Sequence, residues 1–315
     1  MYTIRKNNIS VKAVADFLDI SYSGPNFFIS SANSLNNISD NSVLFYAIAK
    51  DKSNQIIKNM NYDLKKLKQF KNIILITNAT LDKTIDIPIL FSKNPKLDFY
   101  RVILEFFSEN NFKNGIHPSS VIEDGAILGK DVYVGSHCYI GNNVKIGNNT
   151  KVFDNTCIYG ETEIGSNCVI KSNTTIGSEG FGFIPTDDGL FHLPHVGSIL
   201  IGNDVWIGSN STVEKSHLDQ TIIEDDVKID DLVQIGHNTI IKQSTQITSG
   251  CVIVGRVKIG KNCWISPHCV IDVGCELGDN CIVGTSSLVR TNFSNNSVIV
   301  GSPGRLLRKN ESSVR

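Results

Sequence analysis

The chain has 315 residues and a formal net charge of −1. Its length is enough for two domains, and its charge provides no overall basic field that would attract nucleic acid. The start of the chain lacks the apolar core of a signal peptide, and no apolar run approaches the roughly 20 residues that a membrane-spanning helix needs. We therefore expect a cytoplasmic protein with no nucleic-acid partner and no membrane span.

Residues 1–105 predict a small α/β domain. Two apolar runs, residues 43–48 and 72–77, are typical of buried strands. Residues 94–107 have the pattern of an amphipathic helix that begins with an asparagine N-cap followed by proline. This helix should end the domain and lead into the rest of the chain.

From Ile116 to Val289 an aliphatic residue recurs every six positions, interrupted by a loop after residue 176 and a four-residue insertion after residue 213. Neither a helix nor an alternating strand has a period of six. So short a period means that each repeat buries its apolar side only by stacking on its neighbours. We predict a triangular prism of short parallel strands over residues 106–292. Residues 293–315 form a cap and tail, in which residues 298–309 have the pattern of a last strand, a turn and a short basic helix.

The fifth position of each hexad holds small or β-branched residues, which suits a cramped interior corner beside the larger aliphatic one. Seven of the eight cysteines fall there, and Cys157 is the exception. No C-x-x-C spacing points to a metal site or a disulfide framework. We therefore predict reduced cysteines that serve as packing residues, in a reducing compartment.

Two interruptions of the repeat, residues 178–197 and 214–220, are where function is expected, because the insertions of a solenoid collect at its edges. No phosphate loop, nucleophile elbow or metal-ligand motif is present, so we assign no metal. The candidate residues are then the histidines: His117, His137, His192, His195, His217, His237 and His268. His237 stands at the third position of its hexad, which should face outward on a rigid strand. A neutral imidazole there could take a proton from an attacking amine or hydroxyl.

Four segments follow one another as in the UDP-3-O-(3-hydroxyacyl)glucosamine N-acyltransferases of lipid A synthesis. They are residues 180–183 (GFGF), 193–197 (LPHVG), 218–223 (LDQTII) and 228–238 (KIDDLVQIGHN). The resemblance covers nearly the whole chain and is strongest from about residue 94 to residue 260. It implies a homotrimer of left-handed parallel β-helices built from hexapeptide repeats, with active sites between adjacent prisms and no permanently bound cofactor.

The same resemblance implies roles for individual residues. The histidine of the Gln-Ile-x-His-Asn segment is the family's general base toward the sugar amine, and this role falls on His237. Phe45 corresponds to an aromatic residue that stacks on uracil in a nucleotide-sugar-binding N-terminal domain. Further substrate contacts fall on Gly180, Phe181, Gly182, Phe183, Gln234 and Asn238. Gly250 and Gly255 match glycines that flank the donor channel, where the lack of a side chain lets pantetheine approach.

Departures from the family bear on the substrates. The family's second histidine is missing near Gly274, residues 214–217 replace an Asp-Arg-Gly-Ala segment, and a long C-terminal helical segment is absent. The segment 301–303 (GSP) resembles that of nucleotide-sugar acetyltransferases that use coenzyme A. We therefore expect an N-acyltransferase that moves a short or hydroxylated acyl group from acyl-CoA to a UDP- or dTDP-linked amino sugar, for a surface glycan such as the O-antigen of lipopolysaccharide. The alternative is the lipid A enzyme, with acyl carrier protein as its donor.

Two other classes of protein remain open. A metal enzyme like the γ-carbonic anhydrases needs three histidines that converge across a subunit boundary, and His217, His237 and His268 lack the paired spacing expected of it. A catalytically silent trimeric binding scaffold is the other.

Overall fold

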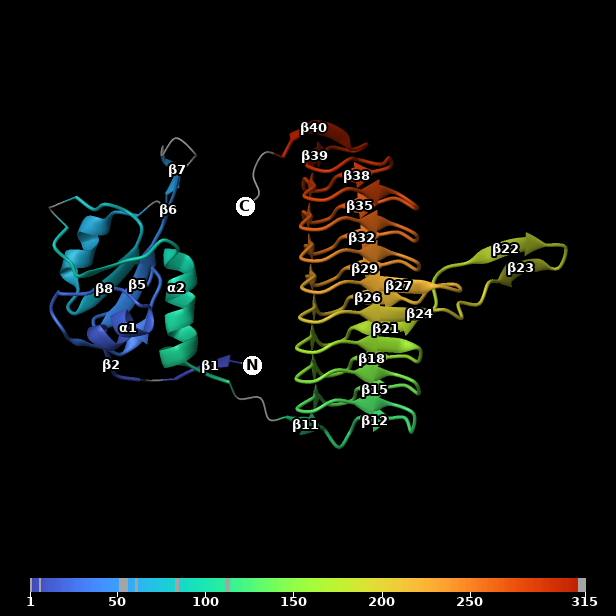
Figure 1. The fold of residues 1–315 in the computed structure, drawn as a ribbon, viewed down its shortest axis with the longest axis horizontal. Coiled ribbons are helices and arrows are strands. Elements are labelled where there is room, and N and C mark those ends of the chain that lie inside the picture. Colours follow the sequence, from blue (N-terminus) through green and yellow to red (C-terminus); the bar gives the residue numbers. More distant parts are fainter. Residues whose placement is uncertain are drawn as a thin grey trace. The chain divides into compact units, whose positions relative to one another are not determined.

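The computed structural model describes residues 2–5, 7–50, 56–59, 62–82, 85–110 and 114–310. The chain divides into two compact units, Met1–Phe112 and Lys113–Arg315 (Figure 1). The division falls later than residue 105, because β10 (Ser108–Asn110) pairs back on β1 (Tyr2–Ile4). In the ranges given above, no helix combines the length and the apolar character needed to cross a membrane.

The N-terminal unit contains a parallel sheet in the order β4 (Ser31–Ala32), β5 (Ser42–Tyr46), β8 (Ile73–Thr77) and β9 (Ile89–Phe91). Both faces of this sheet are covered, which explains why its two central strands are continuous apolar runs. On one face α1 (Val11–Phe17) and α2 (Pro95–Val102) pack, and on the other a 3₁₀ helix, η1 (Leu64–Gln69).

The α/β unit and its last helix are thus confirmed. The side chain of Asn94 caps α2 by accepting a hydrogen bond from the backbone N–H of Leu97 at 3.2 Å, and a π-helical turn, η2 (Ile103–Phe107), continues the helix. The remaining strands of the unit are β2 (Ile9–Ser10), β3 (Phe28–Ile29), β6 (Ile48–Lys50) and β7 (Ile56–Asn59).

The C-terminal unit is a left-handed parallel β-helix with three faces, as predicted (Figure 1). The first face runs through β11 (Gly115–Ile116), β14 (Tyr133–Val134), β17 (Lys151–Val152), β20 (Val169–Ile170), β25 (Trp206–Ile207), β28 (Lys228–Ile229), β31 (Gln246–Ile247), β34 (Trp264–Ile265), β37 (Ile282–Val283), β39 (Ser297–Val300) and β40 (Arg305–Lys309). The second runs through β12 (Val121–Ile122), β15 (Tyr139–Ile140), β18 (Cys157–Ile158), β21 (Thr175–Ser178), β26 (Thr212–Glu214), β29 (Gln234–Ile235), β32 (Val252–Ile253), β35 (Val270–Ile271) and β38 (Leu288–Val289). The third runs through β13 (Ile127–Leu128), β16 (Lys145–Ile146), β19 (Thr162–Ile164), β24 (Ser198–Ile201), β27 (Gln220–Ile223), β30 (Ile240–Ile241), β33 (Lys258–Ile259) and β36 (Glu276–Leu277).

The interior of the β-helix follows the predicted register. From Val134 to Val289 every aliphatic residue of the period is at most 3% exposed. Ile116 is 50% exposed, because its strand β11 is the end strand of the first face. The fifth positions are buried beside them, and they include seven cysteines; Cys157 is half-buried. All eight thiols are free, and seven of them are buried in the interior. The predicted packing role of these seven cysteines is therefore confirmed.

The corners between strands explain the many asparagines of the repeat. The residue before the fifth position has a φ between 54° and 61° wherever it is asparagine. Asparagine tolerates this left-handed conformation better than most residues with a side chain. These corner residues are Asn143, Asn149, Asn155, Asn167, Asn173, Asn210, Asn238, Asn262 and Asn280.

The last strand predicted at the C-terminal end is present, but the short helical cap predicted after it is wrong. The described part of that segment is a pair of strands, in which β39 pairs parallel with β37 and antiparallel with β40. Val298 and Ile299 of β39 are buried and continue the core past the last coil. The reason is the open edge of β39, whose unpaired backbone groups the strand β40 satisfies and a helix could not.

Candidate functional site

Three histidines meet at one corner of the β-helix, between its second and third faces. His195 precedes β24, His217 lies between β26 and β27, and His237 follows β29. The rings of His195 and His217 stack with centroids 3.8 Å apart, and the ring of His237 stands edge-on to that of His217 at 4.3 Å. One ring nitrogen from each histidine lies within 4.8 Å of the others. Of the three, the sequence had singled out only His237.

The two insertions bring His195 and His217 together. After β21 the chain leaves the prism as an exposed hairpin, β22 (Phe183–Thr186) and β23 (Gly189–His192), which projects to one side (Figure 1). It returns along the second insertion, where the backbone N–H of Val196 donates to the carbonyl oxygen of His217 at 2.8 Å. This backbone pairing places the two side chains against each other.

Asn238 sets the tautomers of two of these histidines. Its side-chain Oδ1 accepts a hydrogen bond from the backbone N–H of His217 at 3.2 Å, so this atom must be an acceptor. It also lies 3.0 Å from Nδ1 of His237 and 3.3 Å from Nδ1 of His217. Both Nδ1 atoms therefore carry a proton, and both Nε2 atoms carry a lone pair in the neutral rings.

His195 is fully buried, with 0% of its surface exposed. Its Nδ1–H donates to the carbonyl oxygen of Leu193 at 3.1 Å, while its Nε2 has no hydrogen-bond partner among the residues that the structure describes. Burial lowers the pKa of His195 below its ordinary value of 6.5, and the neighbouring His217 and His237 lower it further. His195 is therefore neutral near pH 7.

Glu214, at the end of β26, holds the strand that carries His237. One carboxylate oxygen accepts from Nε2 of Gln234 at 2.7 Å, and the other accepts from the backbone N–H of His237 at 3.1 Å. Burial raises the pKa of the Glu214 carboxyl group, although these hydrogen bonds and the nearby histidines partly offset that effect. In the sequence, Glu214 stands out only as part of a departure from a related family. Its contact with Gln234 also occupies the amide of a residue predicted to bind substrate.

The glycines of the Gly-Phe-Gly-Phe loop allow the loop to pass directly over the histidines. A Cβ added at Gly180 would lie 2.8 Å from a carboxylate oxygen of Glu214 and 2.9 Å from Nε2 of His195. One added at Gly182 would lie 3.3 Å from Nε2 of His217. A side chain at Gly180 would therefore displace the cluster.

The two glycines predicted to flank the donor channel lie in different surroundings. A Cβ at Gly255 would stand 2.6 Å from Nε2 of His237, so Gly255 belongs to the cluster. Gly250, with a φ of 70°, lies instead against His268, whose Nδ1 would be 2.5 Å from such a Cβ. The structure groups His217 and His237 with His195, whereas His268 lies beside Gly250.

The phenylalanines of the predicted site are found in two places. Phe181 and Phe183 contact each other with ring centroids 5.1 Å apart, and Phe181 is 87% exposed beside the cluster. Phe45 lies on β5 in the N-terminal unit, where its half-buried ring packs against Phe99 at 4.9 Å.

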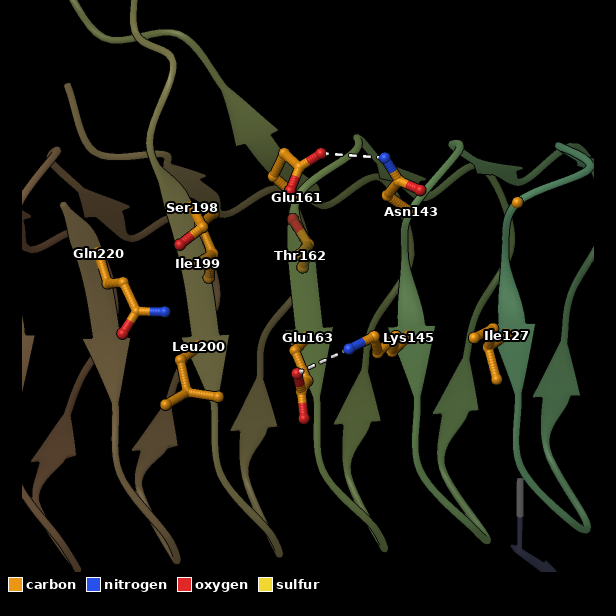
Figure 2. A pocket seen from close by; sticks show the side chains of 11 residues that line it. Ile127, Asn143, Lys145, Glu161, Thr162, Glu163, Ser198, Ile199, Leu200 and Gln220 are labelled. Carbon is orange, nitrogen blue, oxygen red and sulfur yellow. Dashed lines mark hydrogen bonds and ion pairs between the residues drawn. The ribbon is translucent and has the colours of Figure 1, made fainter. Parts of the chain in front are cut away.

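A separate pocket of about 400 Å³ lies on the third face of the β-helix, across β13, β16, β19, β24 and β27 (Figure 2). Its lining is largely polar: Lys145 pairs with Glu163 at 3.6 Å, and Asn143 donates to Glu161 at 3.0 Å. The lining includes none of the clustered histidines. This pocket is therefore distinct from the histidine cluster.

Comparison with known proteins agrees with the fold and the repeat. The bacterial transferase hexapeptide model (six repeats) matches residues 119–154, 143–178 and 256–291. Two solved structures share the fold, at an identity that supports the fold alone. UDP-N-acetylglucosamine acyltransferase from Campylobacter jejuni has a TM-score of 0.55 at 23% identity and covers 62% of this chain and 75% of that one. LpxA from Acinetobacter baumannii has a TM-score of 0.58 at 22% identity, with 62% and 74% covered.

Curated relatives match part of the chain. UDP-3-O-acylglucosamine N-acyltransferase of Acinetobacter baumannii (strain AYE) is 51% identical over 85 residues, which are 27% of this chain and 24% of the relative. That of Delftia acidovorans is 51% identical over 150 residues, or 47% and 44%. The chain thus spans less than half the length of these relatives. It is a left-handed β-helix protein with bacterial transferase hexapeptide repeats, and it resembles the UDP-3-O-acylglucosamine N-acyltransferases.

Proposed function

We propose that the chain is a sugar N-acyltransferase, which moves an acyl group from a thioester to the amine of a nucleotide-linked amino sugar. The observation that carries the proposal is the hydrogen bond from Nδ1 of His237 to Oδ1 of Asn238. It leaves Nε2 of His237 as a proton acceptor on the rigid edge of a hexapeptide β-helix.

In the proposed reaction, the amine nitrogen attacks the carbonyl carbon of the thioester and forms the C–N bond. His237 takes the proton that the attacking nitrogen releases, and the carbonyl oxygen becomes an oxyanion that backbone N–H groups of the prism edge would stabilise. Collapse of this intermediate breaks the C–S bond, and the imidazolium returns its proton to the leaving thiolate. The Oδ1 atom of Asn238 would stabilise the charged ring through the Nδ1–H.

For the substrates, the names of the curated relatives favour the lipid A alternative over the surface-glycan enzyme that the sequence departures suggest. We therefore place UDP-3-O-acylglucosamine with an acyl carrier protein donor first. A specific observation keeps acyl-CoA as the second donor: Arg305, Arg308 and Lys309 lie exposed on β40 and could meet the phosphates of coenzyme A. Arg315, a further basic residue of this tail, lies outside the described residues.

The proposal includes binding of the nucleotide by the N-terminal unit through Phe45, and a homotrimer with the active site between neighbouring prisms. Support for a partner surface comes from large apolar side chains on the two insertions. Phe181, Val196 and Leu218 are 87%, 65% and 79% exposed around the histidine cluster. Exposed apolar surface of this kind is typical of an interface.

The experiment is a product analysis by mass spectrometry. UDP-3-O-acylglucosamine and a panel of UDP- and dTDP-linked amino sugars are each offered with hydroxyacyl carrier protein and with acyl-CoA. We expect an amide product, with the highest kcat/KM for UDP-3-O-acylglucosamine and the carrier-protein donor. Tight sugar binding without turnover for any pair would contradict the proposal and favour a silent scaffold.

A further inference from the structure

Beyond the transferase reaction, we infer that His195, His217 and His237 form a binding site for a divalent transition metal of the Zn²⁺ class. Three neutral imidazoles from one chain are a ligand set that suits zinc and its neighbours in the first transition row. The three residues come from successive coils of a rigid β-helix, so their backbone positions are held independently of any ligand.

The hydrogen bonds around the cluster are those of metal-binding histidines. A histidine that ligates a metal through Nε2 almost always donates its Nδ1–H to a carboxylate, a carbonyl oxygen or water. Here Nδ1 of His195 donates to the carbonyl oxygen of Leu193, and Nδ1 of His217 and of His237 donate to Oδ1 of Asn238. All three Nε2 atoms are thereby left as the nitrogens with free lone pairs.

The buried Nε2 of His195 points to a cation independently of the ligand geometry. It has no partner within the described ranges and no exposed surface, and a buried polar atom left unbonded is costly. It faces Gly180, where the absence of a Cβ leaves space next to the ring. A bound cation would satisfy this atom.

The three imidazole rings must move slightly closer together to bind one ion. One ring nitrogen of each histidine lies within 4.8 Å of those of the other two. Two nitrogens on one tetrahedral zinc ion are about 3.4 Å apart, since each Zn–N bond is about 2.0–2.1 Å. The stacked rings of His195 and His217 must therefore turn toward a common point. His217 and His237 are only half-buried and can rotate.

A second possible set of metal ligands shares His195 with this cluster. Glu179, His192 and His195 also bring their donor atoms within 4.8 Å. However, His192 is already paired with Glu179 at 3.4 Å, and the side chains of both are 41% exposed. The set of three histidines is better enclosed, and His192 serves to distinguish the two sets.

The test measures metal binding directly. Purified full-length protein is stripped with chelator, dialysed against Zn²⁺ and analysed for metal, and Co²⁺ is added in parallel to record the visible absorption of a tetrahedral site. We expect one ion per chain. His195→Ala and His217→Ala should each weaken metal binding by about tenfold or more. Mutating a residue that only hydrogen-bonds to a metal ligand already costs about tenfold in metal affinity, and losing a ligand should cost at least as much. Circular dichroism and thermal melting confirm that each variant is folded.

His117→Ala is the matched control, because His117 is an exposed histidine in the first coil, and it should bind metal as the wild type does. Binding that is absent in the wild type, that survives both His195→Ala and His217→Ala, or that is lost in His192→Ala but kept in His217→Ala would overturn the inference.

A second measurement rests on the proposed function, because a metal on His237 would occupy the proposed base. Added Zn²⁺ should inhibit the transferase, and His217→Ala should reduce that inhibition by about tenfold. If metal binds but no substrate pair is turned over, the transferase proposal fails and the metal site stands. If turnover occurs and no metal binds, the metal site is contradicted and the transferase proposal stands.

Discussion

Asn238 Oδ1 lies 3.0 Å from Nδ1 of His237, its neighbour in the chain, and it can do so because Asn238 occupies a corner of the β-helix with a φ of 59°. The same residue thus turns the backbone and orients the imidazole. Other corner asparagines make other side-chain contacts, as Asn143 does with Glu161. The contribution of the contact between Asn238 and His237 can therefore be measured.

Asn238→Gly should leave the fold intact and reduce turnover by about tenfold or more, because glycine adopts the left-handed corner without a side chain to orient His237. Asn262→Gly is the matched control, since Asn262 occupies an equivalent corner with a φ of 54°. Steady-state kinetics and thermal melting compare the two. Equal activity in both variants would show that the contact does not orient the base.

His237→Ala should lower kcat by about 10²–10⁴-fold if His237 is the general base, with little change in sugar binding or melting temperature. The rival is an amino sugar that already carries a free amine near neutral pH, so that the histidine only orients it. The pH profile of kcat/KM separates the two. A loss of less than tenfold with an unshifted profile would favour the rival.

Gly255→Ala should impair turnover although it adds a single methyl group. The new Cβ would stand 2.6 Å from Nε2 of His237, so the ring must move away from its position. Gly284→Ala is the control for crowding alone, because its Cβ would meet Cγ1 of Val300 at 2.9 Å in a later coil. Steady-state kinetics and melting temperatures are measured for both variants. If the turnover of Gly255→Ala were no lower than that of Gly284→Ala, this role of Gly255 would be contradicted.

Acidification should destabilise the protein through His195. Its folded pKa is lowered below the ordinary 6.5, so the unfolded chain binds more protons than the folded one in the window between those two values. The free energy of unfolding is therefore highest above pH 6.5 and falls as pH falls through that window. Glu214, whose pKa is raised above 4.5, acts in the opposite direction.

Urea unfolding at about pH 7.5 and about pH 5.5 measures this effect. The loss of stability on acidification should be smaller in His195→Gln than in the wild type, because glutamine does not titrate and Glu214 is present in both. An equal loss in the two proteins would mean that His195 is not held neutral.

Thiol titration should separate Cys157 from the other seven cysteines. Cys157 is half-buried on an outward position of β18, while the others are buried and Cys168 has its pKa raised to about 11 by burial. One thiol should react in the native protein, and all eight after denaturation. Rapid reaction of several native thiols would contradict the interior register.

The sequence by itself determined the β-helix, because a period of six ties each aliphatic residue to the same face of every coil. It also determined that His237 faces outward, since that residue stands inside the repeat. The αL corners could have been predicted too, from the asparagines that precede each fifth position. The C-terminal cap could not, because the segment after Val289 is short enough to suit a helix or a strand locally. The open edge of β39, on which β40 pairs, decided it.

Only the tertiary structure brought His195, His217 and Glu214 to His237. Glu214 and His217 stand where the repeat gives way to the second insertion, and His195 lies in the first, so no periodicity assigns their side chains a direction. Their positions follow from where each coil returns the chain to the same corner, and from the backbone hydrogen bond between Val196 and His217. Such contacts depend on the length and pairing of two insertions, and these are set by three-dimensional closure rather than by local pattern.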